Sequence, residues 1–209
     1  MFYNTSIQIT SIALTFVLLI DCCLSLDKHY YRIFHTLDIE HKKVTFLDTS
    51  FFTKLSNWTE KNKVECNDDL KRFTKKIDIF NMRCVLIPAN IGGGHWVLYV
   101  LMNPCSMLKA IDIHNGQFDE KDKKDNAPFL LYFDSLRRIR PPYVQKIYNW
   151  FFGLCNNDPK FNDHQTDLED TMKHKSLLPV INVKGALQDN GYDCGLFVCR
   201  NAYGHVNPL

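Results

Sequence analysis

The sequence lacks a strong excess of charge of either sign. Its 25 Lys and Arg residues against 23 Asp and Glu residues give a formal net charge of +2. This balance gives no reason to expect a nucleic-acid partner, because proteins that bind nucleic acids typically have a strongly basic surface. Internal repeats and low-complexity tracts are also missing. With 209 residues, 45% of them hydrophobic, we expect one globular domain with a substantial core.

The chain also lacks the closely spaced Cys and His motifs of a zinc site, so neither a metal nor a cofactor is expected. Eight cysteines are present, an even number that would allow disulfides. However, Cys84 falls in a strand pattern and Cys199 in a helix pattern, which favours reduced thiols. A nuclear or cytoplasmic location follows as the simpler expectation.

No apolar run is long enough for a transmembrane helix. The longest, residues 12–20, is interrupted by Asp21. Its length suits a signal peptide, and 23–25 would serve as a small-residue cleavage site, but no Lys or Arg precedes it. Two interpretations stay open: a signal peptide of a secreted, disulfide-bonded protein, or a divergent first helix. We therefore treat residues 1–26 apart from a domain at 27–209.

Near the C-terminal end, a cysteine stands between a turn signal and a helical pattern. Asn190 and Gly191 form the turn signal, and apolar residues then recur at helical spacing at Leu196, Cys199 and Tyr203. Cys194 is thus expected at a helix N-terminus, where the helix dipole and unpaired N–H groups favour a charged sulfur over the thiol. This predicts a nucleophile that needs a base.

A histidine and an aspartate at strand ends supply the expected partners. His95 follows three glycines and opens the apolar run 96–101, which is typical of a buried strand. Asp134 ends a second such run, Phe129–Phe133, and an amphipathic helix is expected after Pro141 and Pro142. His95 would act as the base, and Asp134 would orient it.

Several motifs in this order resemble the catalytic domain of the SUMO proteases, also called ubiquitin-like-protein-specific or sentrin-specific proteases. They are His95-Trp96, Phe133-Asp134-Ser135-Leu136, Gln188, Asn190-Gly191 and Asp193-Cys194-Gly195. Upstream segments 49–55 and 70–80, which lead into a strand at 84–88, are similar too. The resemblance covers roughly residues 45 to 204.

The resemblance implies an α+β, papain-like cysteine protease fold, in which a mixed central sheet packs against a helix headed by the catalytic cysteine. It implies Cys194 as nucleophile, His95 as general base and acid, and Asp134 as the group that holds the imidazole. Gln188 would supply the oxyanion hole. These residue types suit the chemistry of acyl transfer by a thiolate.

The implied reaction is hydrolysis after the C-terminal Gly-Gly of a SUMO-type modifier, for deconjugation or precursor maturation. The implied substrate-binding residues are Trp96, which would cover a narrow tunnel for the two glycines, together with Gly191 and Asp193. The expected partner is SUMO or another ubiquitin-like protein and its conjugates, met by a monomer. A viral-type protease with the same order of residues, cleaving peptide bonds after Gly-containing sites, is a further possibility.

Asp112 competes with Asp134 as the orienting carboxylate. Residues 110–116 have the pattern of a strand end followed by a turn, and Asp112 follows His95 by 17 residues, as in short-loop members of the family. Asp134, which follows by 39, has the better local context and requires 117–126 to be an inserted loop. We favour Asp134.

Both ends of the domain depart from the family pattern. Family members begin with a tryptophan and a Leu-Asn-Asp motif, whereas residues 19–21 here are Leu-Ile-Asp and the first tryptophan is Trp58. Only 15 residues follow Cys194. We therefore expect a domain that is incomplete at both ends, with a catalytically weak module that binds ubiquitin-like proteins as the alternative function.

Overall fold

The computed structural model describes residues 43–59, 63–114, 127–137, 141–164, 166, 168 and 178–206. Its centre is a five-stranded sheet in the order β1-β2-β3-β4-β5. The strands are β1 (Val44–Phe46), β2 (Cys84–Ile91), β3 (His95–Met102), β4 (Phe129–Phe133) and β5 (Val180–Asn182). The β2-β3 and β3-β4 pairs are antiparallel, and the two outer pairs are parallel. The expected mixed sheet is confirmed.

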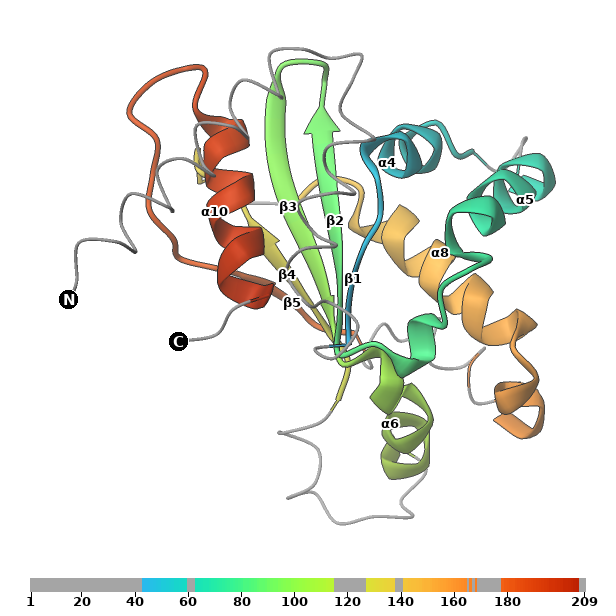
Figure 1. The fold of residues 1–209 in the computed structure, drawn as a ribbon. Coiled ribbons are helices and arrows are strands. Elements are labelled where there is room, and N and C mark those ends of the chain that lie inside the picture. Colours follow the sequence, from blue (N-terminus) through green and yellow to red (C-terminus); the bar gives the residue numbers. More distant parts are fainter. Residues whose placement is uncertain are drawn as a thin grey trace.

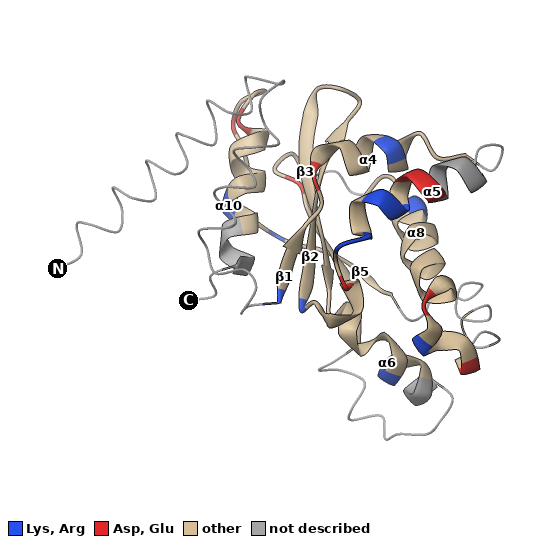
Figure 2. Ribbon diagram, turned by 45° about the vertical axis from the view of Figure 1, so that its right-hand side comes forward, with Lys and Arg blue, Asp and Glu red and all other residues tan. Residues whose placement is uncertain are grey.

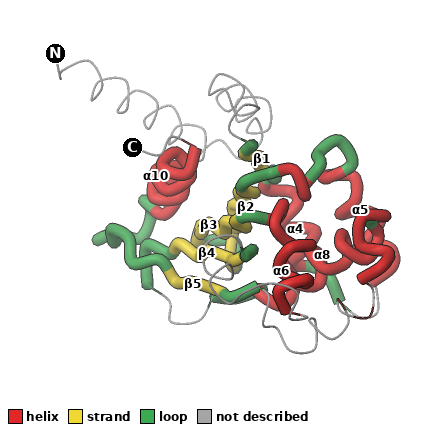
Figure 3. The backbone as a smooth tube through the Cα atoms, turned by 90° about the horizontal axis from the view of Figure 1, so that it is seen from below, coloured by secondary structure: helices red, strands yellow, loops and turns green. Residues whose placement is uncertain are grey.

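Helices cover both faces of this sheet (Figure 1). On one side lie α4 (Thr49–Ser56), α5 (Lys63–Thr74), α6 (Met107–His114) and α8 (Val144–Asn157), and α10 (Cys194–Val206) lies on the other, as the view from below shows (Figure 3). Short 3-10 helices stand at η2 (Ile79–Asn81), η3 (Pro104–Ser106) and η5 (Pro159–His164). The arrangement confirms a sheet packed against a helix that begins at Cys194.

Because both faces are covered, the central strands are apolar on both sides. In β3, Val97, Tyr99 and Leu101 belong to the core shared with α4 and α8, whereas Leu98 and Val100 belong to the core shared with α10. The five strands contain no Asp, Glu, Lys or Arg, so charged residues lie on helices, loops and strand ends (Figure 2). This explains why the strand sequences are continuous apolar runs.

The hairpin between β2 and β3 determines where His95 lies. Ile91 pairs with His95, so three glycines form the connection. Gly92 and Gly93 have φ of +65° and +78°, a left-handed conformation that glycine adopts without strain. The hairpin therefore places the histidine as the first residue of a central strand, next to a tight turn.

On the face of the sheet away from α10, α4 packs against α8 through aromatic contacts. The Asp48 carboxylate caps α4 by accepting hydrogen bonds from the N–H groups of Ser50 and Phe51, at 2.8 and 3.1 Å. Phe51 is fully buried and packs edge-on against Trp150 of α8, with ring centroids 4.9 Å apart. This layer supports the face of the sheet that carries Tyr99 and Tyr132.

The strand end predicted around residues 110–113 is wrong, because these residues belong to α6. Met107, Ala110 and Ile111 recur at helical spacing and are all buried, and this periodicity prevails over the local apolar run. The predicted helix after Pro141 and Pro142 is confirmed as α8. The segment 1–26 and the predicted insertion 117–126 lie outside the described residues. Among the helices that the structure describes, none has the length and apolarity needed to cross a membrane.

Candidate active site

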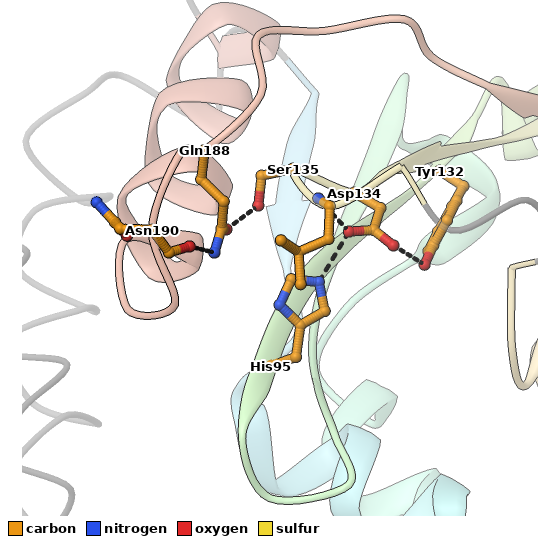
Figure 4. A network of polar contacts seen from close by, with 7 residues as sticks. His95, Tyr132, Asp134, Ser135, Gln188 and Asn190 are labelled. Carbon is orange, nitrogen blue, oxygen red and sulfur yellow. Dashed lines mark hydrogen bonds and ion pairs between the residues drawn. The ribbon is translucent and has the colours of Figure 1, made fainter.

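His95 and Asp134 meet at one end of the sheet. Antiparallel pairing of β3 with β4 sets the start of one strand beside the end of the other, and His95 Nε2 lies 2.8 Å from Asp134 Oδ1. Both side chains are almost fully buried, with 6% and 2% of their surfaces exposed. The second ring nitrogen, Nδ1, points away from Asp134 (Figure 4). The structure thus joins the predicted base to its predicted orienting group.

Asp134 is held by two further hydrogen bonds. The Tyr132 hydroxyl donates to Oδ2 at 2.9 Å, and the backbone N–H of Leu136 donates to Oδ1 at 2.8 Å (Figure 4). A buried carboxylate needs such donors, because an unpaired charge in the interior is costly. Sequence reasoning missed Tyr132. Its position two residues before Asp134, on the same face of the strand, was the available signal.

The competitor Asp112 is not at a strand end. It lies in α6, which follows β3 through η3, and His95 is hydrogen-bonded to Asp134 instead. Of the two carboxylates, Asp134 is the one that the structure pairs with His95.

Cys194 is the first residue of α10 and is buried. The carbonyl of Asp193 accepts hydrogen bonds from the N–H groups of Leu196 and Phe197, at 2.9 and 3.3 Å, which closes the first turn of the helix. α10 packs against β3, and its N-terminal end lies at the end of the sheet where β3 begins (Figure 1). The sulfur therefore stands at the positive end of the helix dipole.

The buried side chain of Gln188 is tied to the end of β4. Its Oε1 accepts a hydrogen bond from the Ser135 hydroxyl, and its backbone N–H donates to the Ser135 carbonyl at 3.2 Å (Figure 4). Its Nε2 donates to the carbonyl of Asn190 at 2.6 Å. Sequence reasoning noticed Ser135 only as part of a motif; the contact with Gln188, 53 residues away, was not expected.

Asn190 organises the loop that leads into α10. Its Oδ1 accepts hydrogen bonds from the N–H groups of Tyr192 and Asp193, at 3.1 and 3.0 Å, and its Nδ2 donates to Asp193 Oδ2 at 2.7 Å. The Asp193 side chain is thus engaged within the loop. A Cβ at exposed Gly191 would meet open space. The roles of Gly191 and Asp193 in substrate binding stay predictions.

Trp96 follows His95 on the other face of β3. It is partly buried and packs against the core shared with α10. It therefore lies next to the base and on the side of the sheet that carries Cys194. A role as a cover for the substrate tail stays a prediction.

The other described cysteines are in different surroundings. Burial raises the pKa of the Cys84 thiol to about 11 and the pKa of the Cys155 thiol still further, so both are poor nucleophiles at neutral pH. Cys105 is exposed and Cys199 partly buried, and none of the five cysteines whose side chains the structure describes, Cys194 included, forms a disulfide. Of the cysteines described, only Cys194 heads a long helix.

Two observations concern other kinds of site. Within the described ranges, no group of three or more His, Cys, Asp or Glu residues could hold a metal ion.

A groove of about 790 Å³ lies between α5, η2, α8 and η5, and its lining includes Trp150, Phe80, Lys75 and Lys160. It contains none of the predicted site residues, so the chemistry of the strand ends is not located there.

The chain is similar in sequence to a family of proteases. Residues 23–208 match the model of the Ulp1 protease family, C-terminal catalytic domain. The chain is 22% identical over 166 residues to the probable ubiquitin-like-specific protease 2B of Arabidopsis thaliana, covering 76% of this chain and 16% of that protein. It is 26% identical over 174 residues to ubiquitin-like-specific protease 2 of Saccharomyces cerevisiae, covering 78% of this chain and 15% of that protein.

A solved structure of a de-sumoylating protease has a similar fold. The TM-score is 0.56 at 20% sequence identity, and the alignment covers 81% of this chain and 56% of that one. The chain therefore spans about half of this structural relative and less than a fifth of the curated relatives it matches.

Proposed function

This chain belongs to the Ulp1 protease family, and we propose that it is a thiol-dependent cysteine peptidase acting on a SUMO-type modifier. It would hydrolyse the bond after the modifier's C-terminal Gly-Gly, either to a lysine side chain or to a precursor extension. The observation that carries this proposal is the buried His95–Asp134 pair, at the same end of the sheet as the helix that begins with Cys194.

The reaction follows from the polar groups at this end of the sheet. His95 takes the proton of the Cys194 thiol, and the sulfur attacks the carbonyl carbon of the terminal glycine. Collapse of the tetrahedral intermediate breaks the C–N bond, and the imidazolium protonates the leaving amine. Water, deprotonated by His95, then hydrolyses the thioester and releases the carboxylate of the modifier and the free thiol.

Asp134 and Gln188 stabilise the charges that develop. The carboxylate fixes the tautomer with a proton on Nε2, which leaves Nδ1 to exchange a proton with the sulfur, and it stabilises the imidazolium. The amide of Gln188 would donate to the oxyanion, a contribution whose loss typically costs about 10²–10³-fold in rate. In this mechanism Asp134 stabilises the positive charge of the imidazolium, and Gln188 stabilises the negative charge of the oxyanion.

Two neighbouring positions support recognition of a slim, ubiquitin-like tail. Trp96 offers an aromatic surface beside His95, and Gly191 leaves open space near the start of α10. The names of the relatives point to the same substrate class, a ubiquitin-like protein. We propose that the protein acts as a monomer. We also propose a location in the nucleus or cytoplasm, because a reducing compartment keeps the Cys194 thiol reduced.

The test is labelling of the purified chain with C-terminal propargylamide probes of SUMO, a Nedd-type modifier and ubiquitin. We expect labelling by SUMO, and we expect Cys194→Ala to abolish both labelling and turnover. Cys105→Ala, which removes an exposed thiol, is the matched control and should leave both intact.

Turnover and affinity are then measured on the same preparation. Release of product from a SUMO fluorogenic amide supports the proposal. A chain that binds SUMO tightly without releasing product would be the non-catalytic binder instead, and labelling at a cysteine other than Cys194 would contradict the assigned nucleophile.

A further inference from the structure

Ser135 connects the two halves of the site. It directly follows Asp134 and is only 5% exposed, and both its hydroxyl and its carbonyl contact Gln188. Its hydroxyl donates to Gln188 Oε1, and its carbonyl accepts the backbone N–H of Gln188 at 3.2 Å (Figure 4). Two contacts between the same pair of residues fix both the main chain and the side chain of Gln188.

We propose that Ser135 is a positioning residue for the oxyanion donor: its hydroxyl orients the side-chain amide of Gln188 so that an N–H faces the reacting carbonyl. The inference rests on the proposed function, because it assigns Ser135 a part in that reaction. Ser135 would act through Gln188 and would not touch the substrate itself.

The orientation of the amide follows from which partners can donate. The Asn190 carbonyl can only accept, so it must meet Nε2 of Gln188, as it does at 2.6 Å. The Ser135 hydroxyl then meets Oε1 as a donor. Turning the amide by half a rotation would set Oε1 against the Asn190 carbonyl, two acceptors facing each other. The Asn190 carbonyl therefore selects the orientation, and the Ser135 hydroxyl holds the amide in it by donating to Oε1.

This orientation leaves one donor over. The amide has two N–H bonds, and the Asn190 carbonyl takes one of them. Among the residues that the structure describes, the second has no acceptor. Because Gln188 is almost completely buried, that N–H is held in a fixed, largely water-free position, which is what an oxyanion donor requires.

The position of Ser135 also explains why the end of β4 matters for two functions. Asp134 holds His95, and the next residue holds Gln188. From Gln188 the contacts continue through Asn190 to Asp193, whose carbonyl closes the first turn of α10. The acid–base pair and the oxyanion donor are thus aligned by adjacent residues of one strand end, where a displacement of about 1 Å can cost about 10²-fold in rate.

The experiment is a double-mutant cycle with Ser135→Ala and Gln188→Ala, measured on a SUMO C-terminal fluorogenic amide. Ser135→Ala should lower kcat about 10-fold with KM unchanged, which is the effect of one lost hydrogen bond. Gln188→Ala should lower kcat about 10²–10³-fold. Because Ser135 acts through Gln188, the double variant should match Gln188→Ala alone. Effects that multiply, or a Ser135→Ala enzyme with normal kcat, would overturn the inference.

A second readout separates positioning from general loss of structure. Labelling by a SUMO propargylamide probe needs the thiolate but forms no oxyanion, so Ser135→Ala should label at the normal rate. Equal losses of labelling and turnover would contradict a role in the oxyanion hole. Ser135→Thr keeps the hydroxyl donor and should recover kcat relative to Ser135→Ala.

Thr74→Val is the matched control for removing a buried hydroxyl. Thr74 lies at the end of α5 and lines the groove that contains none of the predicted site residues, so its replacement should leave kcat unchanged. A wild-type chain that neither labels nor cleaves would overturn the proposed function itself, and the inference with it. An active wild-type enzyme that is insensitive at Ser135 would overturn the inference alone.

Discussion

At the scale of single residues, the Asp134 carboxylate links the proposed base to the end of β4 through three hydrogen bonds. It bonds to His95 through Oδ1 and accepts hydrogen bonds from Leu136 and Tyr132. Each donor favours the charged form of a group that is almost fully buried. The buried charge in turn holds the imidazole in one tautomer, which a fixed base requires.

Tyr132→Phe tests this support at the residue scale. Loss of the 2.9 Å hydrogen bond to Oδ2 removes one of the donors that hold the Asp134 carboxylate in place, so kcat/KM should fall about 10-fold, corresponding to about 1.4 kcal/mol. The measurement is steady-state turnover of a SUMO fluorogenic amide.

Tyr148→Phe is the control for Tyr132→Phe. Tyr148 is also buried and donates to a backbone carbonyl, that of Leu178, but it lies in α8. The Tyr148→Phe variant should be less stable than the wild type, with an unchanged kcat/KM. Equal kinetic losses in the two variants would mean that Tyr132 acts only through the stability of the fold.

At the scale of elements, two helix N-termini have different tasks. α10 begins with Cys194 and presents its positive end to the sulfur of the proposed nucleophile, and Asn190 holds the loop before it. α4 instead begins with a side-chain cap, Asp48, and supports the core. We therefore expect substitutions at the start of α10 to lower activity and substitutions at the start of α4 to lower stability.

Asp48→Ala tests the stabilising terminus. Removing the acceptor for the N–H groups of Ser50 and Phe51 should cost about 1 kcal/mol and lower Tm by about 2–4 °C, as thermal unfolding would show. Asp68→Ala is the matched control, because that side chain is 67% exposed and its ion pair with Lys71 lies at the surface. It should change stability by less than about 0.5 kcal/mol. Equal losses would rule out the cap as the cause.

At the scale of the whole molecule, covering both faces of the sheet buries ionisable groups as well as apolar ones. Cys84 lies in β2 against α10's side of the sheet, and burial raises its pKa from 9.0 to about 11. Burial also raises the pKa values of Cys155 and Tyr99. All three groups stay neutral in the folded chain at a pH where they would ionise in the unfolded chain.

Stability should therefore fall in alkali. The Cys84 thiol ionises near pH 9 in the unfolded chain and near pH 11 in the folded one, so rising pH favours the unfolded state across this window. Its contribution is complete below about pH 9 and is lost progressively by about pH 11, amounting to about 2–3 kcal/mol. Urea unfolding at a series of pH values measures this loss.

Cys84→Ala isolates the single thiol, because Cys155 and Tyr99 remain in both proteins. The stability difference between wild type and Cys84→Ala should shrink as the pH rises from 9 to 11. A difference that stays constant over this range would show that the Cys84 thiol does not ionise differently in the two states.

Much of the framework could be predicted from local sequence. The strand Phe129–Phe133 has the predicted bounds, and the strand after the three glycines begins at His95 as expected. Strands that are buried on both faces are continuous apolar runs, and a turn signal before helical spacing locates the start of α10. The motifs of the family were readable for the same reason, since each occupies a short stretch of chain.

Other features could not be predicted from local sequence. Residues 110–113 were misassigned to a strand, because a short apolar run is compatible with either a strand or a helix until its neighbours bury it. The contact of Ser135 with Gln188 joins residues 53 positions apart, and no local pattern specifies it. Asp112 and Asp134 were both plausible partners for His95, because no local pattern specifies a contact between residues that are distant in the sequence.

The sequence by itself thus determined which residue types are present for thiol chemistry, their order, and the elements that carry them. The tertiary structure decided which carboxylate reaches His95 and how the Gln188 amide is turned. Periodicity and turn chemistry are properties of neighbouring residues, so they can be read along the chain. Hydrogen bonds between strand ends and loops depend on sheet register and helix packing, which exist only once both faces of the sheet are covered.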